Sequence, residues 1–295
     1  MVTISEIFHF INPSMSKILD LDVSFRHFSP ISSAQKGDVT FCTDVSENGI
    51  TLICSSKASL IICHSDLFKK IKNSESNLIF VDFPKLTFIR CLNKFTSSLP
   101  HYGIHPSSIV ETKELGKNIS IGPFCYISKN VVIGDNVKIL GNVCIYDDTI
   151  IGNNVTIQAS TVIGTDGFGY ELNEEKKYEK FPHIGGVEIH DCVEIGASNC
   201  IDKGALKNTI IESGTKTDNF VHIAHNVHLG KNCLLAAGVT TSGSCKIKDN
   251  VFIGTGSTLR DWITVGENSF IGVGSVVTKD IPDSTTVYGV PARKH

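Results

Sequence analysis

The stretch that decides the fold is IGDNVKILGNVCIYDDTIIGNNVTIQASTVI, residues 133–163. An isoleucine returns at every sixth position in it, and the same step extends upstream. The aliphatic residues in this register are Leu115, Ile121, Ile127, Ile133, Ile139, Ile145, Ile151, Ile157 and Ile163. After a break the step resumes at 189, 195 and 201, and after a second break it runs from Ile211 to Val277. The dominant signal in this chain is therefore a six-residue period.

A period of six matches neither an α-helix nor an isolated strand, because those repeat apolar residues every three to four positions or every two. It is the hexapeptide signature of a parallel β-helix, in which one aliphatic residue per hexad points inward. Three hexads make one triangular coil of about eighteen residues. A residue should therefore lie below the one eighteen positions later wherever no insertion intervenes.

The rest of the chain is organised around this predicted rod. Residues 1–104 lack the period and alternate helical patterns such as TISEIFHFI with short apolar runs such as TLICS, SLIICH and NLIFVDF, which indicates a small α/β domain. Residues 105–280 are the expected β-helix, and residues 164–188 are a loop rich in Gly and aromatic residues that leaves it. Residues 281–295 are expected to be a C-terminal tail. The predicted fold class is mainly β.

Composition excludes several classes of function. With a net charge of −3 and a pI near 6.4, the 295-residue chain lacks the basic surface that nucleic-acid binding needs. No apolar run is long enough for a membrane span and the N-terminus has no signal-peptide pattern, so we expect a cytoplasmic protein. Ten cysteines include no C-x-x-C pair, which favours reduced, buried thiols over a zinc ribbon or redox motif.

A set of short stretches spread over nearly the whole chain carries a family resemblance. They are PISSAQKGDVTF (30–41), LIFVDFPKLTFIRCL (78–92), GIHPSSIV (103–110), GTDGFGY (164–170), IDKGAL (201–206), DNFVHIAHNV (218–227) and SGSCKI (242–247). These stretches resemble the UDP-3-O-acylglucosamine N-acyltransferases of lipid A synthesis, and GTDGFGY together with DNFVHIAHNV is the specific combination. The resemblance implies a left-handed β-helix, a homotrimer with active sites between subunits, an N-terminal nucleotide-binding domain and acyl transfer to a sugar amine.

The chain departs from that pattern at four places. One coil of the rod and the C-terminal helices that engage acyl carrier protein in that family are not found. Trp262 stands where a second active-site histidine is expected, and no aromatic follows Phe41 to complete a sandwich around a uracil. The ending YGVPAR, with Pro291, is similar instead to the close of CoA-dependent sugar acetyltransferases.

These departures favour the related nucleotide-sugar N-acyltransferases that act on amino-deoxy sugars of surface polysaccharides such as O-antigen. We expect transfer from acyl-CoA, as a co-substrate and not a resident cofactor, to the amine of a dTDP- or UDP-linked amino-deoxy sugar. The alternative is UDP-3-O-(3-hydroxyacyl)glucosamine N-acyltransferase of lipid A synthesis, using acyl carrier protein. Two further classes are a non-catalytic trimeric scaffold and a carbonic anhydrase relative with zinc held across subunits.

Three histidines lie within VHIAHNVHLG, residues 221–230. His222 and His228 occupy equivalent hexad positions on adjacent faces, so they point apart and cannot share a metal within one chain; we expect no metal site. His225 matches the catalytic histidine of the family and suits a general base, because the attacking amine must lose a proton near neutral pH. The resemblance pairs Asp218 with it, and Gly243 lies eighteen positions on, where its N–H could bind the oxyanion.

Binding residues are predicted for both substrates. Asp166, Phe168 and Tyr170 on the loop are expected to line the acceptor site, with Phe41 stacking on the nucleotide base. Small residues around Ala237 and Gly238 suit the pantetheine arm of CoA, together with Gly243 and Pro291. Tight coil packing would demand small residues at 236–239 equally well.

Overall fold

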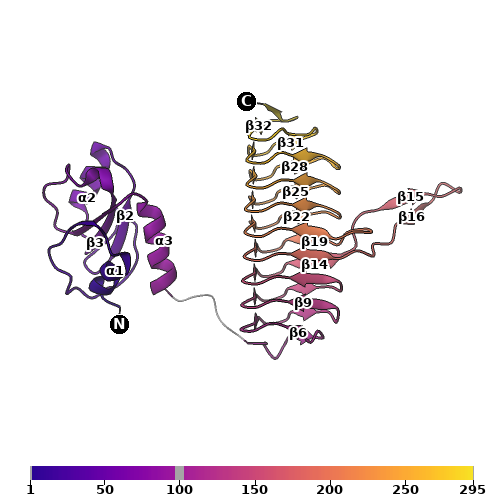
Figure 1. Ribbon diagram of the computed structural model, residues 1–295, viewed down its shortest axis with the longest axis horizontal. Helices are drawn as coiled ribbons and strands as arrows, with labels where there is room; N and C mark the ends of the chain where they lie inside the picture. The colour runs from indigo at the N-terminus through magenta and orange to yellow at the C-terminus, as the bar shows by residue number, and fades with distance from the viewer. Residues whose placement is uncertain (1, 97–102, 295) are drawn as a thin grey trace. The chain divides into compact units, whose positions relative to one another are not determined.

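The N-terminal part of the chain folds around a four-stranded sheet. The computed structural model describes residues 2–96 and 103–294, which separate into two units, and this sheet lies in the first. Its strands are β1 (Met15–Lys17), β2 (Val39–Cys42), β3 (Leu60–His64) and β4 (Asn77–Val81), in the spatial order β1-β4-β3-β2 with β1 antiparallel to the rest. The helices are α1 (Ile4–Ile11), α2 (Glu47–Ser55), the 3-10 helix η1 (Ser65–Leu67) and α3 (Pro84–Phe95) (Figure 1).

Local sequence explains these elements, with one exception. Thr3 and Glu6 form a capping box that starts α1, and Pro84 stands in the first turn of α3. The apolar runs around Ile61 and Ile79 become the buried strands β3 and β4. The run TLICS was expected to behave like them but forms the second half of α2, where Ile53 faces the core. The α/β prediction is nevertheless confirmed.

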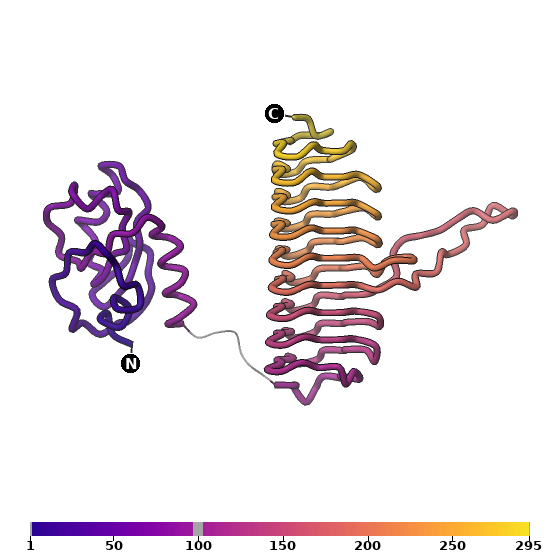
Figure 2. The backbone as a smooth tube through the Cα atoms, in the orientation of Figure 1, coloured from indigo at the N-terminus to yellow at the C-terminus, as the bar shows by residue number. Residues whose placement is uncertain are grey.

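The second unit is a parallel β-helix whose three faces are three parallel sheets (Figure 2). Face 1 contains β7 (Ser120–Ile121), β10 (Lys138–Ile139), β13 (Thr156–Ile157), β18 (Glu194–Ile195), β21 (Lys216–Thr217), β24 (Leu234–Leu235), β27 (Phe252–Ile253), β30 (Phe270–Ile271), β32 (Thr286–Tyr288) and, antiparallel at its end, β33 (Arg293–Lys294). Face 2 contains β5 (Ile109–Val110), β8 (Tyr126–Ile127), β11 (Cys144–Ile145), β14 (Val162–Thr165), β19 (Cys200–Asp202), β22 (His222–Ile223), β25 (Thr240–Thr241), β28 (Thr258–Leu259) and β31 (Val276–Val277). Face 3 contains β6 (Glu114–Leu115), β9 (Val131–Ile133), β12 (Thr149–Ile151), β17 (Val187–Ile189), β20 (Thr209–Ile211), β23 (His228–Leu229), β26 (Lys246–Ile247) and β29 (Thr264–Val265).

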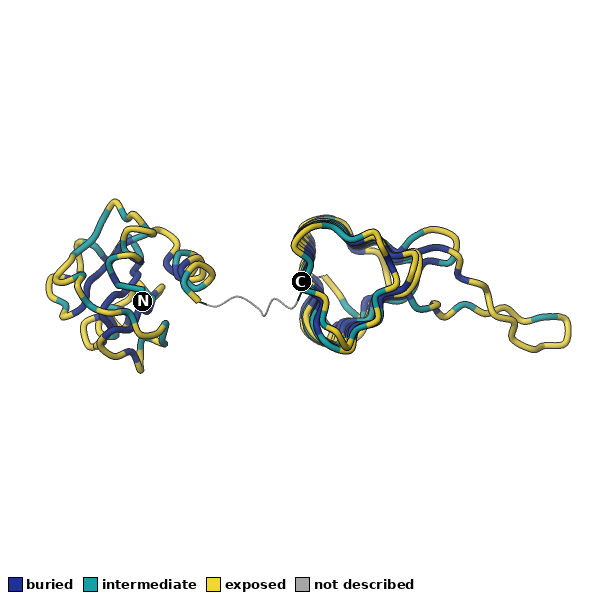
Figure 3. Tube along the Cα trace, turned by 90° about the horizontal axis from the view of Figure 1, so that it is seen from below, coloured by how far each residue is buried: buried dark blue, intermediate teal, exposed yellow. Residues whose placement is uncertain are grey.

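The predicted stacking distance is confirmed in the uninterrupted coils. Lys138 pairs with Thr156 and His222 with Thr240, each partner eighteen residues away. The isoleucines of the six-residue register from Ile121 onward are buried in one continuous column inside the rod (Figure 3). The fold is therefore mainly β, a left-handed parallel β-helix preceded by a small α/β domain, as predicted.

Two insertions interrupt the stacking. Thr149 pairs with Val187, thirty-eight residues on, because the chain leaves the rod as an antiparallel hairpin of β15 (Tyr170–Leu172) and β16 (Tyr178–Lys180). Cys200 pairs with His222, twenty-two residues on, because IDKGAL adds four residues to the next coil. We call residues 164–186 the excursion; Figure 3 shows it leaving the rod at one corner.

The ends of the rod differ from the expected boundaries. Ile104 already bridges to Ile121, so the rod's unit begins before residue 105. The expected tail does not leave the rod: Ile281 bridges to Val265, and β32 pairs with β30. Val287 is buried there, which explains why this segment continues the coil. Three cysteines expected to be buried are exposed, Cys54, Cys192 and Cys200.

Candidate active site

His225 lies in the turn between β22 and β23, at the corner where face 2 meets face 3. Gly243 occupies the same corner one coil later, and the N–H of Ser244 donates to the carbonyl of His225 at 2.9 Å. A Cβ on Gly243 would lie 2.6 Å from both Cε1 and Nε2 of the imidazole. The structure thus brings His225 and Gly243 together, and only glycine leaves room for the ring.

Asn226 fixes which nitrogen of His225 carries the proton. The backbone N–H of Ala205 donates to Oδ1 of Asn226 at 3.0 Å, so this atom must be the amide oxygen. Nδ1 of His225 lies 3.0 Å from the same oxygen and must donate to it. In the neutral imidazole Nε2 therefore holds the lone pair, on the side of Gly243, as a general base requires. Sequence reasoning did not single out Asn226.

Asp218 does not contact His225 within one chain. It follows β21 on face 1, whereas His225 follows β22 on face 2, so the two residues lie at different corners of the coil. The Asp218 side chain is exposed, and its Oδ1 accepts the N–H of Asn219 at 2.7 Å. The two residues therefore do not pair inside one chain, because seven residues span one whole side of the triangle, and the pairing that the resemblance implies stays a prediction.

Two clefts meet at His225. The smaller, of about 490 Å³, is lined mainly by face 2 and the coils above it: Phe168, Asp202, His222, Ala224, His225, Thr240, Thr241, Ser242, Gly243, Asp261 and Trp262. The larger, of about 950 Å³, lies between face 3 and the excursion and is lined by Gly169, Tyr170, Glu171, Phe181, His183, Ala205, Leu206, Lys207, His225, Asn226, Ser244, Lys246 and Trp262. His225 thus borders both clefts, which suits a reaction between two substrates.

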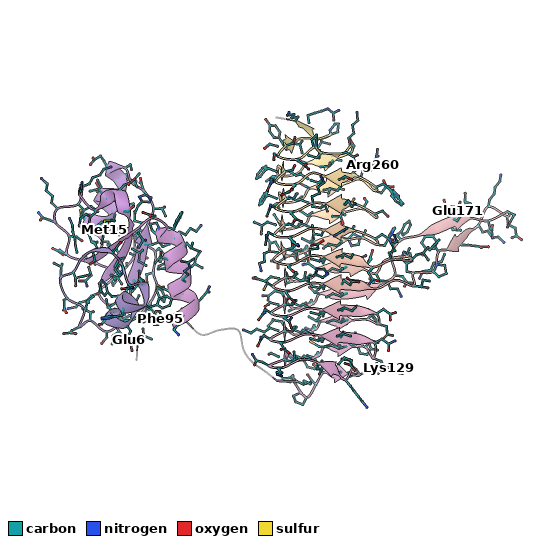
Figure 4. All side chains as sticks on the ribbon, viewed as in Figure 1. Glu6, Met15, Phe95, Lys129, Glu171 and Arg260 are labelled. Atoms are coloured by element: carbon teal, nitrogen blue, oxygen red, sulfur yellow. The ribbon has the colours of Figure 1, made fainter. Side chains whose placement is uncertain are left out.

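The excursion packs directly against His225. A Cβ on Gly167 would lie 2.6 Å from Cβ and 2.8 Å from Cδ2 of His225. Phe168 lines the smaller cleft and Tyr170 the larger one, with their ring centroids 5.1 Å apart. Glu171 marks the start of the hairpin in Figure 4. Two of the three predicted acceptor residues of this loop, Phe168 and Tyr170, therefore line the clefts that His225 borders.

Asp166 is held by two lysines at the root of the excursion. It forms ion pairs with Lys180 and, at 3.0 Å, with Lys203. These hydrogen bonds hold the pKa of the Asp166 carboxyl below its ordinary value. The carboxylate ties the hairpin to the coil of β19, a structural role that sequence reasoning did not anticipate.

His183 is a site residue that sequence analysis missed. It is 5% exposed, and its ring centroid lies 5.3 Å from that of His225 in an edge-to-face arrangement. Nδ1 donates to the carbonyl of Phe181 at 2.9 Å, while Nε2 is buried without a hydrogen-bond partner among the described residues. Its position depends on how the excursion folds back, which no period in the sequence encodes.

The two other histidines of VHIAHNVHLG each face a carboxylate. Nε2 of His222 lies 3.7 Å from Asp202 on face 2, and Nε2 of His228 lies 2.7 Å from Oε1 of Glu212 on face 3. They lie on different faces, as predicted. Within residues 2–96 and 103–294, no group of three or more His, Cys, Asp or Glu side chains could hold a metal ion. No helix in those residues is long and apolar enough to cross a membrane.

Three of the remaining predicted binding residues lie on the rod but not at the corner of His225, and the fourth belongs to the other unit. Ala237 and Gly238 form the corner between faces 1 and 2, and Pro291 is exposed in the turn after β32, three coils further along face 1. Phe41 belongs to the N-terminal unit, where it is half-buried on β2 and its ring packs 4.8 Å from that of Phe88. The structure leaves the binding roles of all four as predictions.

Comparison with known proteins agrees with this fold. The family described as "Bacterial transferase hexapeptide (six repeats)" matches residues 130–165, 208–243 and 244–279. UDP-3-O-acylglucosamine N-acyltransferase from Delftia acidovorans is 38% identical over 92% of this chain and 81% of its own length. A second such enzyme, from Sulfurimonas denitrificans, is 42% identical over 44% of this chain and 42% of its own length.

Solved structures are similar in the same way. UDP-N-acetylglucosamine acyltransferase from Bacteroides fragilis is 30% identical with a TM-score of 0.57, covering 65% of this chain and 73% of that one. The enzyme from Campylobacter jejuni has a TM-score of 0.58 at 26% identity, with the same coverage. The protein is an acyltransferase of the hexapeptide-repeat, left-handed β-helix class. Within this class, the chain belongs to the UDP-3-O-acylglucosamine N-acyltransferase family.

Proposed function

We propose that this protein transfers an acyl group from a thioester to the amine of a UDP-linked amino sugar, as its relatives' name describes. The observation that carries the proposal is His225, whose Nε2 lone pair faces Gly243 where two clefts meet. Two clefts allow the thioester and the sugar amine to approach one base from different sides. The name of the relatives favours an acceptor similar to UDP-3-O-acylglucosamine over the amino-deoxy sugars that the four departures from the family pattern suggested.

The chemistry uses His225 as a general base. The amine nitrogen attacks the thioester carbonyl carbon, its proton passes to Nε2, and the backbone N–H of Gly243 donates to the developing oxyanion. The carbon–sulfur bond then breaks, and the imidazolium returns the proton to the departing sulfur. Asn226 supports this cycle because it keeps the proton of the resting imidazole on Nδ1.

The corner of Gly238 supports the proposed donor site. Gly238, Gly256 and Gly274 stack there in consecutive coils with positive φ angles of 65° to 69°. A Cβ on Gly256 or Gly274 would meet nothing within 4 Å, so the corner is an open strip along the rod. We place the pantetheine arm of the donor along this strip, from Ala237 toward Pro291.

The acceptor is proposed to lie in the larger cleft. Tyr170 lines its excursion side, and Phe168 lines the smaller cleft next to it. Stacking of Phe41, in the N-terminal unit, on the nucleotide base stays a prediction.

We propose a homotrimer as the working form. The clefts are open on one chain, and Asp218 lies on a corner different from that of His225. A neighbouring copy could bring its Asp218 to His225, as the family resemblance implies. Light scattering at micromolar concentration tests this: a fully active monomer would exclude it.

A second candidate is transfer from acyl-CoA to an amino-deoxy nucleotide sugar. Trp262 favours it, because this side chain stands where the lipid A enzymes are expected to carry a second histidine. Trp262 is 77% exposed, has a φ of +61° and borders both clefts. The left-handed conformation itself belongs to the coil turns, because Phe124 and Phe220 adopt it at equivalent positions with φ of +59° and +60°.

The deciding experiment measures thiol release with defined substrates. The purified protein is incubated with UDP-3-O-acylglucosamine and hydroxyacyl carrier protein, and separately with dTDP-linked amino sugars and acetyl- or butyryl-CoA. Turnover of the first pair supports the primary proposal, and turnover of the second pair alone supports the second candidate. No turnover of either, with His225 intact and the fold confirmed by circular dichroism, would contradict both.

A further inference from the structure

Asp202 is a buried carboxylate in the cleft of His225. It ends β19, and its side chain is 12% exposed. One oxygen accepts from Thr165 Oγ1 at 3.2 Å, and the other lies 3.7 Å from Nε2 of His222. Asp202 and His225 line the same cleft of about 490 Å³. Burying a carboxylate is costly, so a position that keeps one beside a cleft indicates a use for its charge.

Two histidines, His222 and His225, line the same cleft as this carboxylate. Burial raises the pKa of Asp202, and the nearby His222, His225 and His183 oppose that rise. The interaction is reciprocal: an imidazolium that stabilises the carboxylate is stabilised by it to the same extent. In one chain Asp202 lines the same cleft as His225, whereas Asp218 lies at another corner.

We propose that Asp202 is a positioning residue whose negative charge stabilises the imidazolium formed on His225. This inference rests on the proposed function, because the imidazolium forms when the amine nitrogen gives its proton to Nε2 during attack on the thioester carbon. The carbon–sulfur bond then breaks and the same proton passes to sulfur, so the carboxylate itself never exchanges a proton. Asp202 acts inside one chain and does not depend on a neighbouring copy.

Other charged groups near His225 must be separated from this effect. His222 on β22 shares the carboxylate, and His183 approaches the ring from the excursion. Asp261 borders the cleft one coil above Gly243, but it is exposed and lies 3.9 Å from Nε of Arg260, which Figure 4 labels on the rod. Asp166 is already paired with lysines. Asp202 is thus the buried negative charge on this cleft among the described residues.

The test compares pH profiles of two amide variants. Asp202→Asn keeps the size of the side chain and removes its charge, and Glu212→Gln does the same beside His228 on face 3. We expect Asp202→Asn to lose about tenfold in kcat/KM at neutral pH. The acid-side midpoint of its profile should move toward lower pH, because an imidazolium without its carboxylate gives up its proton more easily. Glu212→Gln should keep the profile of the unmodified protein.

A profile of Asp202→Asn that overlays the original, or a loss of rate without a moved midpoint, would overturn the proposal. A second measurement does not require turnover: diethyl pyrocarbonate labels unprotonated imidazoles, and mass spectrometry follows labelling of His225 against pH. We expect the midpoint of labelling to fall in Asp202→Asn and to stay in Glu212→Gln. An unchanged labelling midpoint would sink this inference even in an active enzyme. Absence of acyl transfer with a shifted midpoint would instead sink the proposed function alone.

Discussion

The uninterrupted coils above His225 and the interrupted coils around it are built from the same hexads but carry different kinds of residue. From β24 to β31 every coil has eighteen residues, and its inward positions are filled by buried apolar or threonine side chains. In the coils from β14 to β22 two insertions bring Gly167, His183 and Asp202 to the imidazole of His225. The comparison teaches that the repeat supplies rigidity and its interruptions supply the chemistry.

The largest expected effect concerns His225, which lies at the corner where the interrupted coils meet the uninterrupted ones. His225→Ala removes the base and should lower kcat by about 10² to 10⁴. Thermal unfolding should change little, because a half-exposed imidazole fills little of the core. Steady-state thiol release measures the loss. The matched control is His228→Ala, three residues away on face 3; if both variants keep more than about a tenth of the activity, the base lies elsewhere.

The next effect tests whether the excursion must pack against the base. Gly167→Ala places a methyl group where the nearest atoms of His225 and His183 lie 2.6 to 2.9 Å away, so one of them must move. A displacement of about 1 Å at a catalytic group can cost about 10² in rate. Gly141→Ala is the control, since its added carbon would stay at least 3.2 Å from its neighbours, near the N-terminal end of the rod. Equal activity of the two variants would show that the contact is unimportant.

A third substitution addresses the uninterrupted coils and should separate stability from activity. Ile253 is fully buried on β27, and Ile253→Ala should cost about 2 to 5 kcal/mol of the free energy of unfolding, as cavity-forming substitutions do. Activity below the unfolding transition should stay near that of the unmodified protein. Chemical denaturation and thiol release measure the two quantities. A loss of kcat without a loss of stability would mean that the rod does more than hold the site.

The smallest expected effect is on stability and concerns the free-energy cost of keeping the buried Asp202 carboxylate ionised. Burial raises the pKa of this carboxyl above its ordinary value of 3.8, so the folded state binds the proton more tightly than the unfolded state does. This tighter proton binding stabilises the folded state fully at pH values below the ordinary pKa of 3.8. The stabilisation is lost as pH rises through the raised pKa of the folded state. At neutral pH, Asp202→Asn should therefore unfold at the same temperature as the original protein or slightly higher.

The advantage of Asp202→Asn should disappear as pH falls below about 3.8, because the carboxyl is then neutral in both states. Differential scanning calorimetry across this range makes the check. If Asp202→Asn were less stable than the unmodified protein at neutral pH but not in acid, the negative charge of Asp202 would support the fold. In that case the electrostatic reading of Asp202 would need revision.

Sequence reasoning placed residues well where the eighteen-residue spacing holds. Gly243 was expected above His225 and lies there, since no insertion separates them. Sequence reasoning did not single out His183 or Asp202. His183 lies within the first insertion and Asp202 precedes the second, so the eighteen-residue spacing places neither of them relative to His225. Asp218 was paired with His225 by resemblance alone, and the triangular coil puts it at another corner. The α/β character of residues 2–96 was predicted, but TLICS became a helix.

By itself the sequence determined the rod, its three faces, the inward isoleucines and the stacking of Gly243 on His225. It could do so because each of these depends on spacing between near neighbours in a strict repeat. Only the tertiary structure decided that Asn226 sets the tautomer of His225, that His183 and Gly167 pack against the ring, and that Asp202 is the buried carboxylate of the cleft. Those contacts involve segments that the two insertions separate in the sequence. Their geometry follows from how the inserted segments fold back, which depends on packing and ion pairs and not on a sequence period.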